Sequence, residues 1–143
     1  MKKLITLCAL LLLISSCNLE PKRINYGEDS CHYCSMTIVD RQHAAQLITK
    51  KGKVYNFDAA ECMIHALPDF EEVKIGRCLV TDYEIPEKLV DASSATFIVS
   101  PEIPSPMRAN LAALASKPNA VDLQQAKGGE LYTWEEIKML LKK

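Results

Sequence analysis

Two short strand-like runs separated by a glycine are the clearest pattern of apolar and polar positions in the chain. Residues 45–49 and 53–57 are rich in β-branched, aromatic and other strand-compatible side chains, and Lys50-Lys51-Gly52 lies between them. Glycine supplies the positive φ that a tight turn needs. This segment therefore predicts a β-hairpin.

The residues after this hairpin have the periodicity of a helix. Asp58 stands where a helix N-cap is expected, and Pro68 stands where the helix should end. One face of the helix collects the apolar side chains Ala59, Cys62, Met63, Ala66 and Leu67. Residues 73–81 form a further β-rich run, so the order is strand, strand, helix and strand.

A second part of the chain repeats this pattern 76 to 77 residues later. Residues 44–47 match 120–123, residues 54–58 match 131–135, and residues 62–64 match 139–141. A T-x-x-E capping box at Thr133 and Glu136 predicts the start of the second helix. Its expected buried stripe is Trp134, Ile137, Leu140 and Leu141.

With the β-rich run at residues 95–99, the second part also reads as strand, strand, helix and strand. Two short matches can arise by chance, but the shared order of elements favours duplication. We predict an α+β protein of two small pseudo-repeated ββαβ-like units, residues 29–75 and 76–143.

The N-terminus has the features of a bacterial lipoprotein signal. Lys2 and Lys3 precede an apolar run at residues 4–14 that is too short to span a bilayer, and Ser15-Ser16-Cys17 resembles a lipobox. We expect residues 1–16 to be a lipoprotein signal peptide and Cys17 to be acylated. Residues 17–28, rich in charge, are expected to form a flexible tether. The folded part is then lipid-anchored to a bacterial membrane on its extracytoplasmic, periplasmic side.

Composition narrows the possible functions. Removal of the first sixteen residues leaves 15 basic and 18 acidic side chains, with no basic patch or nucleic-acid motif, so nucleic acid is not an expected partner. Hydrophobic residues make up 48% of the chain and glycine only five positions, which suits a protein with its own core rather than a disulfide scaffold. The sequence contains no serine-histidine-aspartate set, phosphate loop or carboxylate constellation that would support hydrolysis.

The segment Cys31-His32-Tyr33-Cys34-Ser35-Met36 carries the strongest chemical signal. It places two thiols, an imidazole and a thioether in six residues. A thioether is a poor ligand for zinc, whereas Cu(I) favours thiolate and thioether sulfur. Cys34 and Met36 can reach one ion either from an extended strand or from a tight turn, so they are the first candidate metal ligands.

Met107 is the second candidate thioether. It follows Pro101, Pro104 and Pro106, which restrict the backbone around it. In the proposed repeat, its loop and the Cys34–Met36 segment precede corresponding hairpins. An ion held between the two halves would then take sulfur from both.

These motifs together resemble the NosL family of copper-chaperone lipoproteins. The elements that carry the resemblance are Cys31-x-x-Cys34-x-Met36, Ala44-Ala45-Gln46, Phe57-Asp58-x-x-Glu61-Cys62-Met63, Asp82-Tyr83, residues 92–99, Pro106-Met107 and Gly128-Gly129-Glu130-Leu131. The resemblance covers nearly the whole chain after the signal peptide. The family often has glycine at the positions of Ser35 and Arg108, which leaves the loop geometry there open.

The resemblance implies a membrane-anchored Cu(I)-binding metallochaperone that is not an enzyme. Its copper ligands are Cys34, Met36 and Met107, and its recipient is nitrous oxide reductase or the membrane machinery that matures that enzyme. Two ββαβ units, as predicted above, are also what the family implies.

Several alternatives remain open from the residues. Cys31 is a third thiolate, a disulfide partner of Cys34, or a ligand that takes part in transfer. His32 is expected to point away from the metal, and Cys62 and Cys78 are expected in the core. A zinc site of four cysteines would require both to converge on the C-x-x-C motif. The main rival function is an extracytoplasmic thiol-disulfide oxidoreductase that uses Cys31 and Cys34, although a β-favouring run follows the motif instead of a helix.

Overall fold

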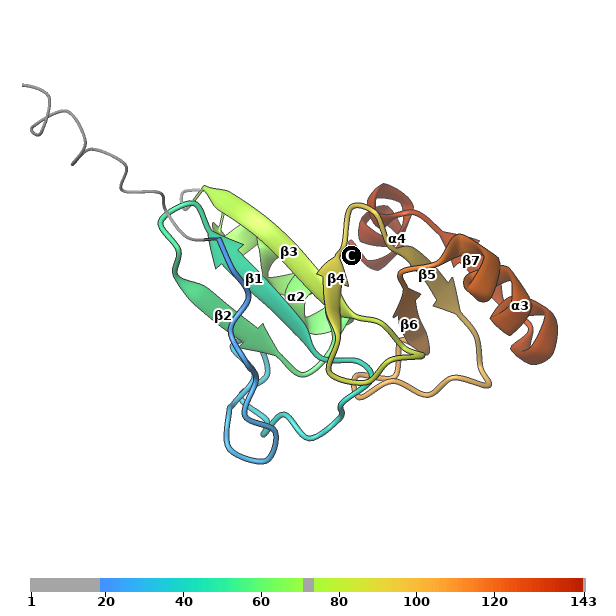
Figure 1. Ribbon diagram of the computed structural model, residues 1–143, viewed down its shortest axis with the longest axis horizontal. Helices are drawn as coiled ribbons and strands as arrows, with labels where there is room; N and C mark the ends of the chain where they lie inside the picture. Colours follow the sequence, from blue (N-terminus) through green and yellow to red (C-terminus); the bar gives the residue numbers. More distant parts are fainter. Residues whose placement is uncertain (1–18, 71–73, 143) are drawn as a thin grey trace, which may run out of the picture.

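A four-stranded antiparallel sheet forms the first half of the molecule. The computed structural model describes residues 19–70 and 74–142, and Figure 1 shows the arrangement of its elements. The strand order is β2-β1-β3-β4, from β1 (Ala45–Thr49), β2 (Val54–Phe57), β3 (Ile75–Thr81) and β4 (Leu89–Asp91). The predicted hairpin is confirmed, with Ala45 opposite Phe57 and Ile48 opposite Val54.

The second half contains a smaller sheet with the same local topology. β5 (Thr96–Val99) lies between β6 (Leu111–Leu114) and β7 (Glu130–Tyr132), and both pairings are antiparallel. The order β6-β5-β7 matches β2-β1-β3 of the first sheet. A helix precedes the third strand in each case, so the α+β fold of two ββαβ units is confirmed.

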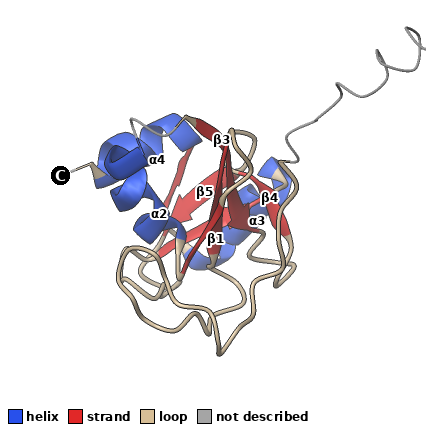
Figure 2. Ribbon diagram, turned by 90° about the vertical axis from the view of Figure 1, so that its left-hand side faces the viewer, coloured by secondary structure: helices blue, strands red, loops and turns tan. Residues whose placement is uncertain are grey.

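Each unit has a helix before its third strand, and a further helix follows the second unit. In the first unit, α2 (Ala60–Ala66) continues into the 3-10 turn η1 (Leu67–Phe70). In the second unit, α3 (Lys117–Lys127) precedes β7, and α4 (Trp134–Leu141) ends the described chain. Figure 2 shows α2 and α4 side by side at one side of the strands, where they contact each other.

The two sheets share one core. Asp82 forms a parallel bridge with Ala113, and the Tyr83 N–H donates to the Ala113 carbonyl at 2.8 Å. A single apolar cluster runs from Leu47 and Met63 of the first unit to residues of the second, including Phe97 and Trp134, whose rings stack at 5.6 Å. The site can therefore draw residues from both units.

The capping prediction was right for one helix and wrong for the other. Thr133 and Glu136 form the predicted capping box of α4, although Leu140 is 46% exposed and lies outside the buried stripe. In α2 the N-cap is Ala59, and no side chain caps the helix. Asp58 is instead buried beneath it.

The proposed pairing of the two repeats was also wrong. Residues 120–123, matched to the first strand, lie within α3, because Ser116 caps that helix by accepting from the Asn119 N–H and a proline stands in its first turn. The true counterpart of β1 is β5. Met107 therefore lies in the connection between β5 and β6, and does not precede a hairpin as Cys34 and Met36 do.

The expected unit boundary and tether need revision as well. β3 begins at Ile75 and pairs with β1, so the strand that completes the first unit lies almost wholly beyond residue 75. Residues 19–28 are fastened to the first sheet: Lys22 and the Gln46 side chain exchange two hydrogen bonds of 2.9 Å, and Ile24 is buried. The expected signal peptide and Cys17 lie outside the described residues. Among the described helices, none is long and apolar enough to cross a membrane.

Candidate metal centre

The C-x-x-C segment forms a closed hairpin loop. Ser30 and Thr37 form an antiparallel bridge, and the Cys31 N–H donates to the Met36 carbonyl at 2.8 Å. Inside the loop, the Ser35 N–H donates to the Cys31 carbonyl at 2.9 Å, and Ser35 has a φ of 63°. Of the two geometries open to Cys34 and Met36, the structure has the tight turn.

Hydrogen bonds hold this loop against β2. The His32 N–H donates to the Asn56 carbonyl at 2.9 Å, and the Asn56 side chain donates to Asp29 at 2.9 Å. Gln46 in turn donates to the Asn56 side-chain oxygen at 2.8 Å. The loop is thus positioned by polar side chains of the sheet before any metal binds.

Three cysteine sulfurs meet where the loop reaches α2. The Sγ atoms of Cys31, Cys34 and Cys62 all lie within 4.8 Å of one another. Cys31 and Cys62 are buried, Cys34 is partly buried, and all three are free thiols. Sulfurs at this spacing can close on one soft ion with small side-chain movements.

Cys62 is the residue that sequence reasoning assigned to the core. It is indeed fully buried on α2, but the hairpin loop packs its thiols against that part of the helix. A buried cysteine on an apolar face looks the same in sequence whether it is a packing residue or a ligand. The available signal was its place in the E-C-M element of the family resemblance.

The hydrogen bonds of the cluster favour one thiolate. The pKa of Cys31 is lowered to about 4, because its sulfur accepts from the Cys62 thiol and from backbone N–H groups that include those of Cys34 and Asp58. The bond to the Cys31 sulfur raises the pKa of Cys62, and burial raises that of Cys34. The metal-free cluster therefore carries one negative charge and two protons that an incoming soft cation can displace.

Met36 lies on the same loop as Cys31 and Cys34, and Met107 lies on the loop that bonds to Glu61, the residue before Cys62. Met36 ends the same hairpin loop and is 46% exposed. Met107 is partly buried against the main core. The Arg108 N–H donates to the Ser105 carbonyl at 2.9 Å, so Met107 lies within a tight turn.

This turn is fastened to the helix that carries Cys62. The Ser105 hydroxyl donates to Glu61, the residue before Cys62, and accepts from the Leu111 N–H at 3.3 Å. The second unit thus contributes a loop to the site through a buried hydrogen bond.

Ser35 and Arg108, the two positions where the family often has glycine, have the left-handed backbone conformation that glycine favours. Arg108 has a φ of 63°, equal to that of Ser35. Left-handed φ values favour glycine but are accessible to other residues at a modest cost. The departures from glycine therefore leave both loop turns in place.

The three histidines do not join the sulfur cluster. The His32 ring packs on Tyr55 at 4.6 Å and Phe70 at 5.6 Å between ring centres. His65 stacks on Tyr33 at 5.7 Å. His43 is buried, and its Nδ1 lies 3.0 Å from Asp40.

Two buried carboxyl groups lie behind the thiols. Asp58 donates its backbone N–H to the Cys31 sulfur, and Glu61 precedes Cys62. Burial, followed by the charge of Cys31, raises the pKa of Asp58 to about 6. One oxygen of each carboxyl group has no hydrogen-bond partner among the described residues.

Cys78 provides an internal contrast. It lies on β3, outside the sulfur cluster, and burial raises its pKa to about 11. The expectation that Cys78 packs as an apolar residue is confirmed by its contacts with the main core. A zinc site of four cysteines is therefore not formed by the described residues.

The sulfur cluster does not line the groove between α2 and α4. A groove of about 340 Å³ lies between α2 and α4 and is lined by residues that include His65, Lys138 and Met139. None of the four described cysteines lines it. Cys34 is only partly buried and Met36 is exposed, so this side of the cluster is the one nearest solvent.

Comparison with known families decides the identity of the chain. The NosL family profile matches residues 23–141. The chain belongs to the NosL family. The copper-binding lipoprotein NosL of Stutzerimonas stutzeri is 30% identical over 132 residues, which span 87% of this chain and 69% of that protein.

A solved NosL structure has the same fold. The copper chaperone NosL from Shewanella denitrificans superposes with a TM-score of 0.71 at 23% identity, over 83% of this chain and 96% of that one. The names of both relatives describe copper-binding proteins, and neither describes an enzyme. The predicted membership of the NosL family is thus confirmed.

Proposed function

We propose that this protein is a membrane-anchored Cu(I) metallochaperone that delivers copper for the maturation of nitrous oxide reductase. The observation that carries the copper part is the convergence of three sulfurs within 4.8 Å, beside a thioether on the same loop. Sulfur-only ligation with thioether favours Cu(I) over zinc and over harder ions. The names of the two relatives support copper as the cargo.

Cu(I) is held by Cys34, Met36 and Met107. The buried thiols of Cys31 and Cys62 either complete this ligand set or take over the ion during transfer. Exposure differs across these ligands: Met36 is 46% exposed, Cys34 is partly buried, and Cys31 and Cys62 are buried. An incoming ligand from a partner reaches the ion from the exposed side. Transfer then proceeds by associative exchange, with the exposed thioether replaced before the buried thiolates.

Acylation of Cys17 places this carrier at the extracytoplasmic face of a membrane. The lipobox at residues 14–17 and the lipoprotein name of the Stutzerimonas relative support this anchor. The recipient is nitrous oxide reductase or its membrane maturation machinery, which rests on the family resemblance.

Competition between metals tests the copper part. The reduced chain should bind Cu(I) in preference to Zn(II) when both compete with chromophoric chelators. Cys34→Ser should lose that preference, and Cys78→Ser, a free cysteine outside the cluster, should keep it. Preferred binding of zinc by the wild type would contradict the proposal.

Complementation tests the recipient. In a strain that lacks this chain, nitrous oxide reductase should contain less copper, and the wild type and Cys78→Ser should restore it. Cys34→Ser should not. A reductase with full copper content in the deletion strain would exclude it as the recipient.

A second candidate function has one observation in its favour. The low pKa of Cys31 is typical of reactive thiols in oxidoreductases. However, the C-x-x-C motif lies in a bridged hairpin and not at a helix N-terminus. Insulin reduction that disappears in both Cys31→Ala and Cys34→Ala, together with weak copper binding by the wild type, would favour this function.

A further inference from the structure

We infer that the end of the first sheet that carries Lys50, Lys51, Lys53 and Lys74, here called the basic end, lies on the membrane and contacts anionic phospholipid headgroups. This inference rests on the proposed acylation of Cys17. It assigns a second surface, distinct from the sulfur cluster, and an orientation to the anchored protein.

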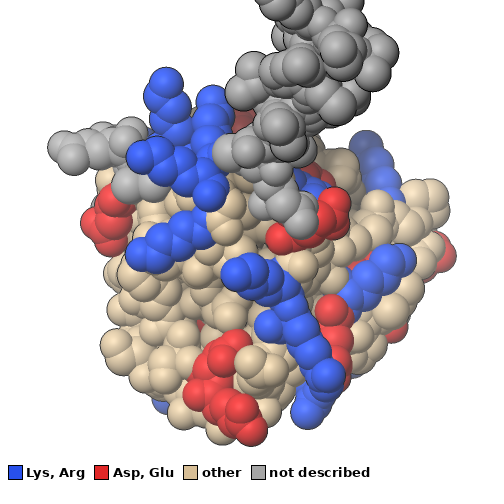
Figure 3. All heavy atoms as spheres, turned by 60° about the vertical axis from the view of Figure 1, so that its left-hand side comes forward, with Lys and Arg blue, Asp and Glu red and all other residues tan. Residues whose placement is uncertain are grey.

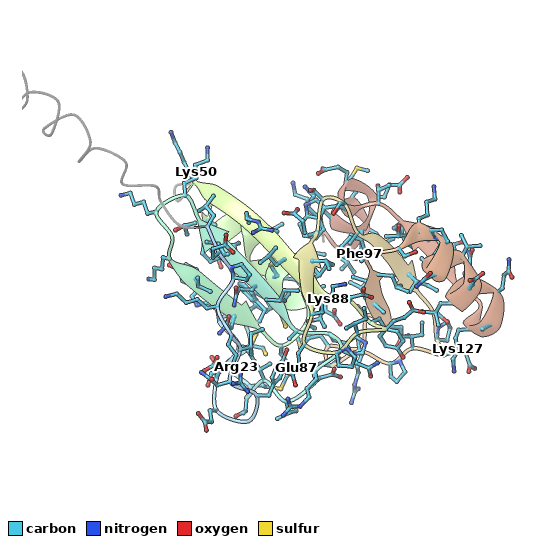
Figure 4. The ribbon with its side chains drawn as sticks, viewed as in Figure 1. Arg23, Lys50, Glu87, Lys88, Phe97 and Lys127 are labelled. Carbon is cyan, nitrogen blue, oxygen red and sulfur yellow. The ribbon has the colours of Figure 1, made fainter. Side chains whose placement is uncertain are left out.

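The basic end is formed by the β1–β2 turn and the residue before β3. All four lysines are exposed. The Lys50 N–H donates to the Lys74 carbonyl at 2.8 Å, which places these two residues side by side. Figure 3 shows Lys and Arg side chains gathered over one end of the molecule, and Figure 4 shows Lys50 pointing outward from that end.

Acidic residues also occur near this end in the sequence. Glu20 is close to the start of the described chain, and Glu71 and Glu72 precede Lys74 outside the described residues. The exposed lysines of the β1–β2 turn supply the attraction for anionic headgroups.

The described chain also starts at the basic end. The Leu19 carbonyl accepts from the Arg77 guanidinium at 3.3 Å, and the Leu19 side chain lies against Gly76. Cys17 precedes Leu19 by only two residues. Two residues span at most about 7 Å, so the acyl chains enter the bilayer close to this end of the sheet.

A lipid anchor and a cluster of lysines act together. The acyl chains hold the protein at the bilayer, and a nearby basic surface adds electrostatic attraction to anionic lipids. Each lysine at such a surface contributes about a fivefold factor in binding. Only residue 18 lies between Cys17 and the fastened segment 19–24, which keeps the basic end near the acyl chains.

This orientation sets the position of the copper site. The sulfur cluster lies at the opposite end of β1, where Asp58 follows Phe57, the partner of Ala45. Five residues of strand separate the two ends, or roughly 16 Å. The exposed ligands are therefore held away from the lipid surface. There, the part of a partner protein that lies outside the membrane can reach them.

Lysine labelling of the anchored full chain tests the inference. The acylated protein is reconstituted on vesicles of phosphatidylglycerol and phosphatidylethanolamine, or of phosphatidylcholine alone, and flotation confirms attachment. Amine acylation is then followed at each lysine by mass spectrometry. On the anionic vesicles, Lys50, Lys51, Lys53 and Lys74 should react several-fold more slowly, high salt should remove the protection, and Lys88 and Lys127 should be unchanged.

Two triple variants provide the matched comparison. K50E/K51E/K74E should abolish the protection of Lys53 on anionic vesicles, and K88E/K117E/K127E should preserve it. Equal labelling on both vesicle types, or protection of Lys88 and Lys127 in its place, would overturn the orientation while leaving the copper proposal intact. A chain that fails to float would overturn the anchor, and the orientation with it.

Discussion

The helices α2 and α3 occupy equivalent places in two units of the same topology, but only α2 contributes to the sulfur cluster. Six of the seven α2 residues are buried, whereas Ala120 is the only buried residue of α3. The difference comes from their neighbours, because α4 and the C-x-x-C hairpin loop cover α2. A repeated scaffold therefore acquires a metal site where additional segments enclose one of its helices.

The connections between the hairpin strands differ in the same way. β1 and β2 are joined by the short turn at residues 50–53, and β5 and β6 by the long connection at residues 100–110. The long connection carries Met107 and bonds to α2 through Ser105. The second unit thus contributes to the site through a loop, while the first contributes through a helix and the preceding hairpin.

The largest effect is expected from the cysteine closest to solvent. Cys34→Ser should weaken Cu(I) binding at least about 100-fold, because loss of a direct ligand exceeds the usual effect of a supporting residue. Cys78→Ser should leave the dissociation constant unchanged. Competition with a chromophoric Cu(I) chelator measures both dissociation constants, and equal values for the two variants would show that Cys34 is not a copper ligand.

Asp58→Asn should stabilise the metal-free protein at pH 7. Burial raises the pKa of Asp58 from 3.8 to about 6, so the folded state retains a proton that the unfolded state releases. Stability should therefore fall as the pH rises from about 4 to about 6 and stay lower above it, and asparagine should recover about 1–3 kcal/mol.

Urea unfolding across this pH range measures that effect. Asp122→Asn, on the exposed α3, is the matched control and should leave the pH dependence unchanged. An unaltered slope in Asp58→Asn would show that this carboxyl group is not held protonated by its burial.

Met107→Ala should weaken Cu(I) binding about tenfold, or ~1.4 kcal/mol. It removes the thioether contributed by the second unit but leaves the Ser105–Glu61 bond in place. Met139→Ala, at a methionine that is 68% exposed on α4, should have no effect. If both variants bind copper like the wild type, Met107 is a packing residue and the site belongs to the first unit alone.

The smallest effects should distinguish the two helix caps. Thr133→Ala and Ser116→Ala each remove a side-chain cap and should each lower stability by about 1 kcal/mol. Only Thr133→Ala should also weaken copper binding, by about twofold, because α4 packs on α2. Thermal unfolding measures the loss of stability, and the chelator assay measures the Cu(I) dissociation constant. If Ser116→Ala weakens copper binding as much as Thr133→Ala does, the proposed difference between the two helices is wrong.

Local signals explain what the sequence predicted correctly. The alternating runs at residues 45–57 and the T-x-x-E box at Thr133 act through their own neighbours, so the hairpin and the start of α4 follow from sequence. The pairing of the repeats failed because residues 120–123 resemble a strand in composition, while Ser116 and the proline after Lys117 act as a helix start.

Only part of the metal site could be predicted from the sequence, for a different reason. Residues close in sequence, such as Cys31 and Cys34, indicate a cluster, but Cys62 joins them only through tertiary packing of the hairpin loop against α2. The carboxyl group of Asp58 was read as a cap because its burial depends on the hairpin loop above it. Long-range packing of this kind leaves no periodic signal in one sequence.

X-ray absorption at the copper edge of the reduced, Cu(I)-loaded protein tests the central claim most directly. Sulfur neighbours alone at the metal are predicted for the wild type, and Cys62→Ser should show whether the thiol on α2 is one of them by lowering the sulfur count. A wild-type spectrum with only nitrogen and oxygen neighbours would contradict a copper site built from the hairpin loop and α2.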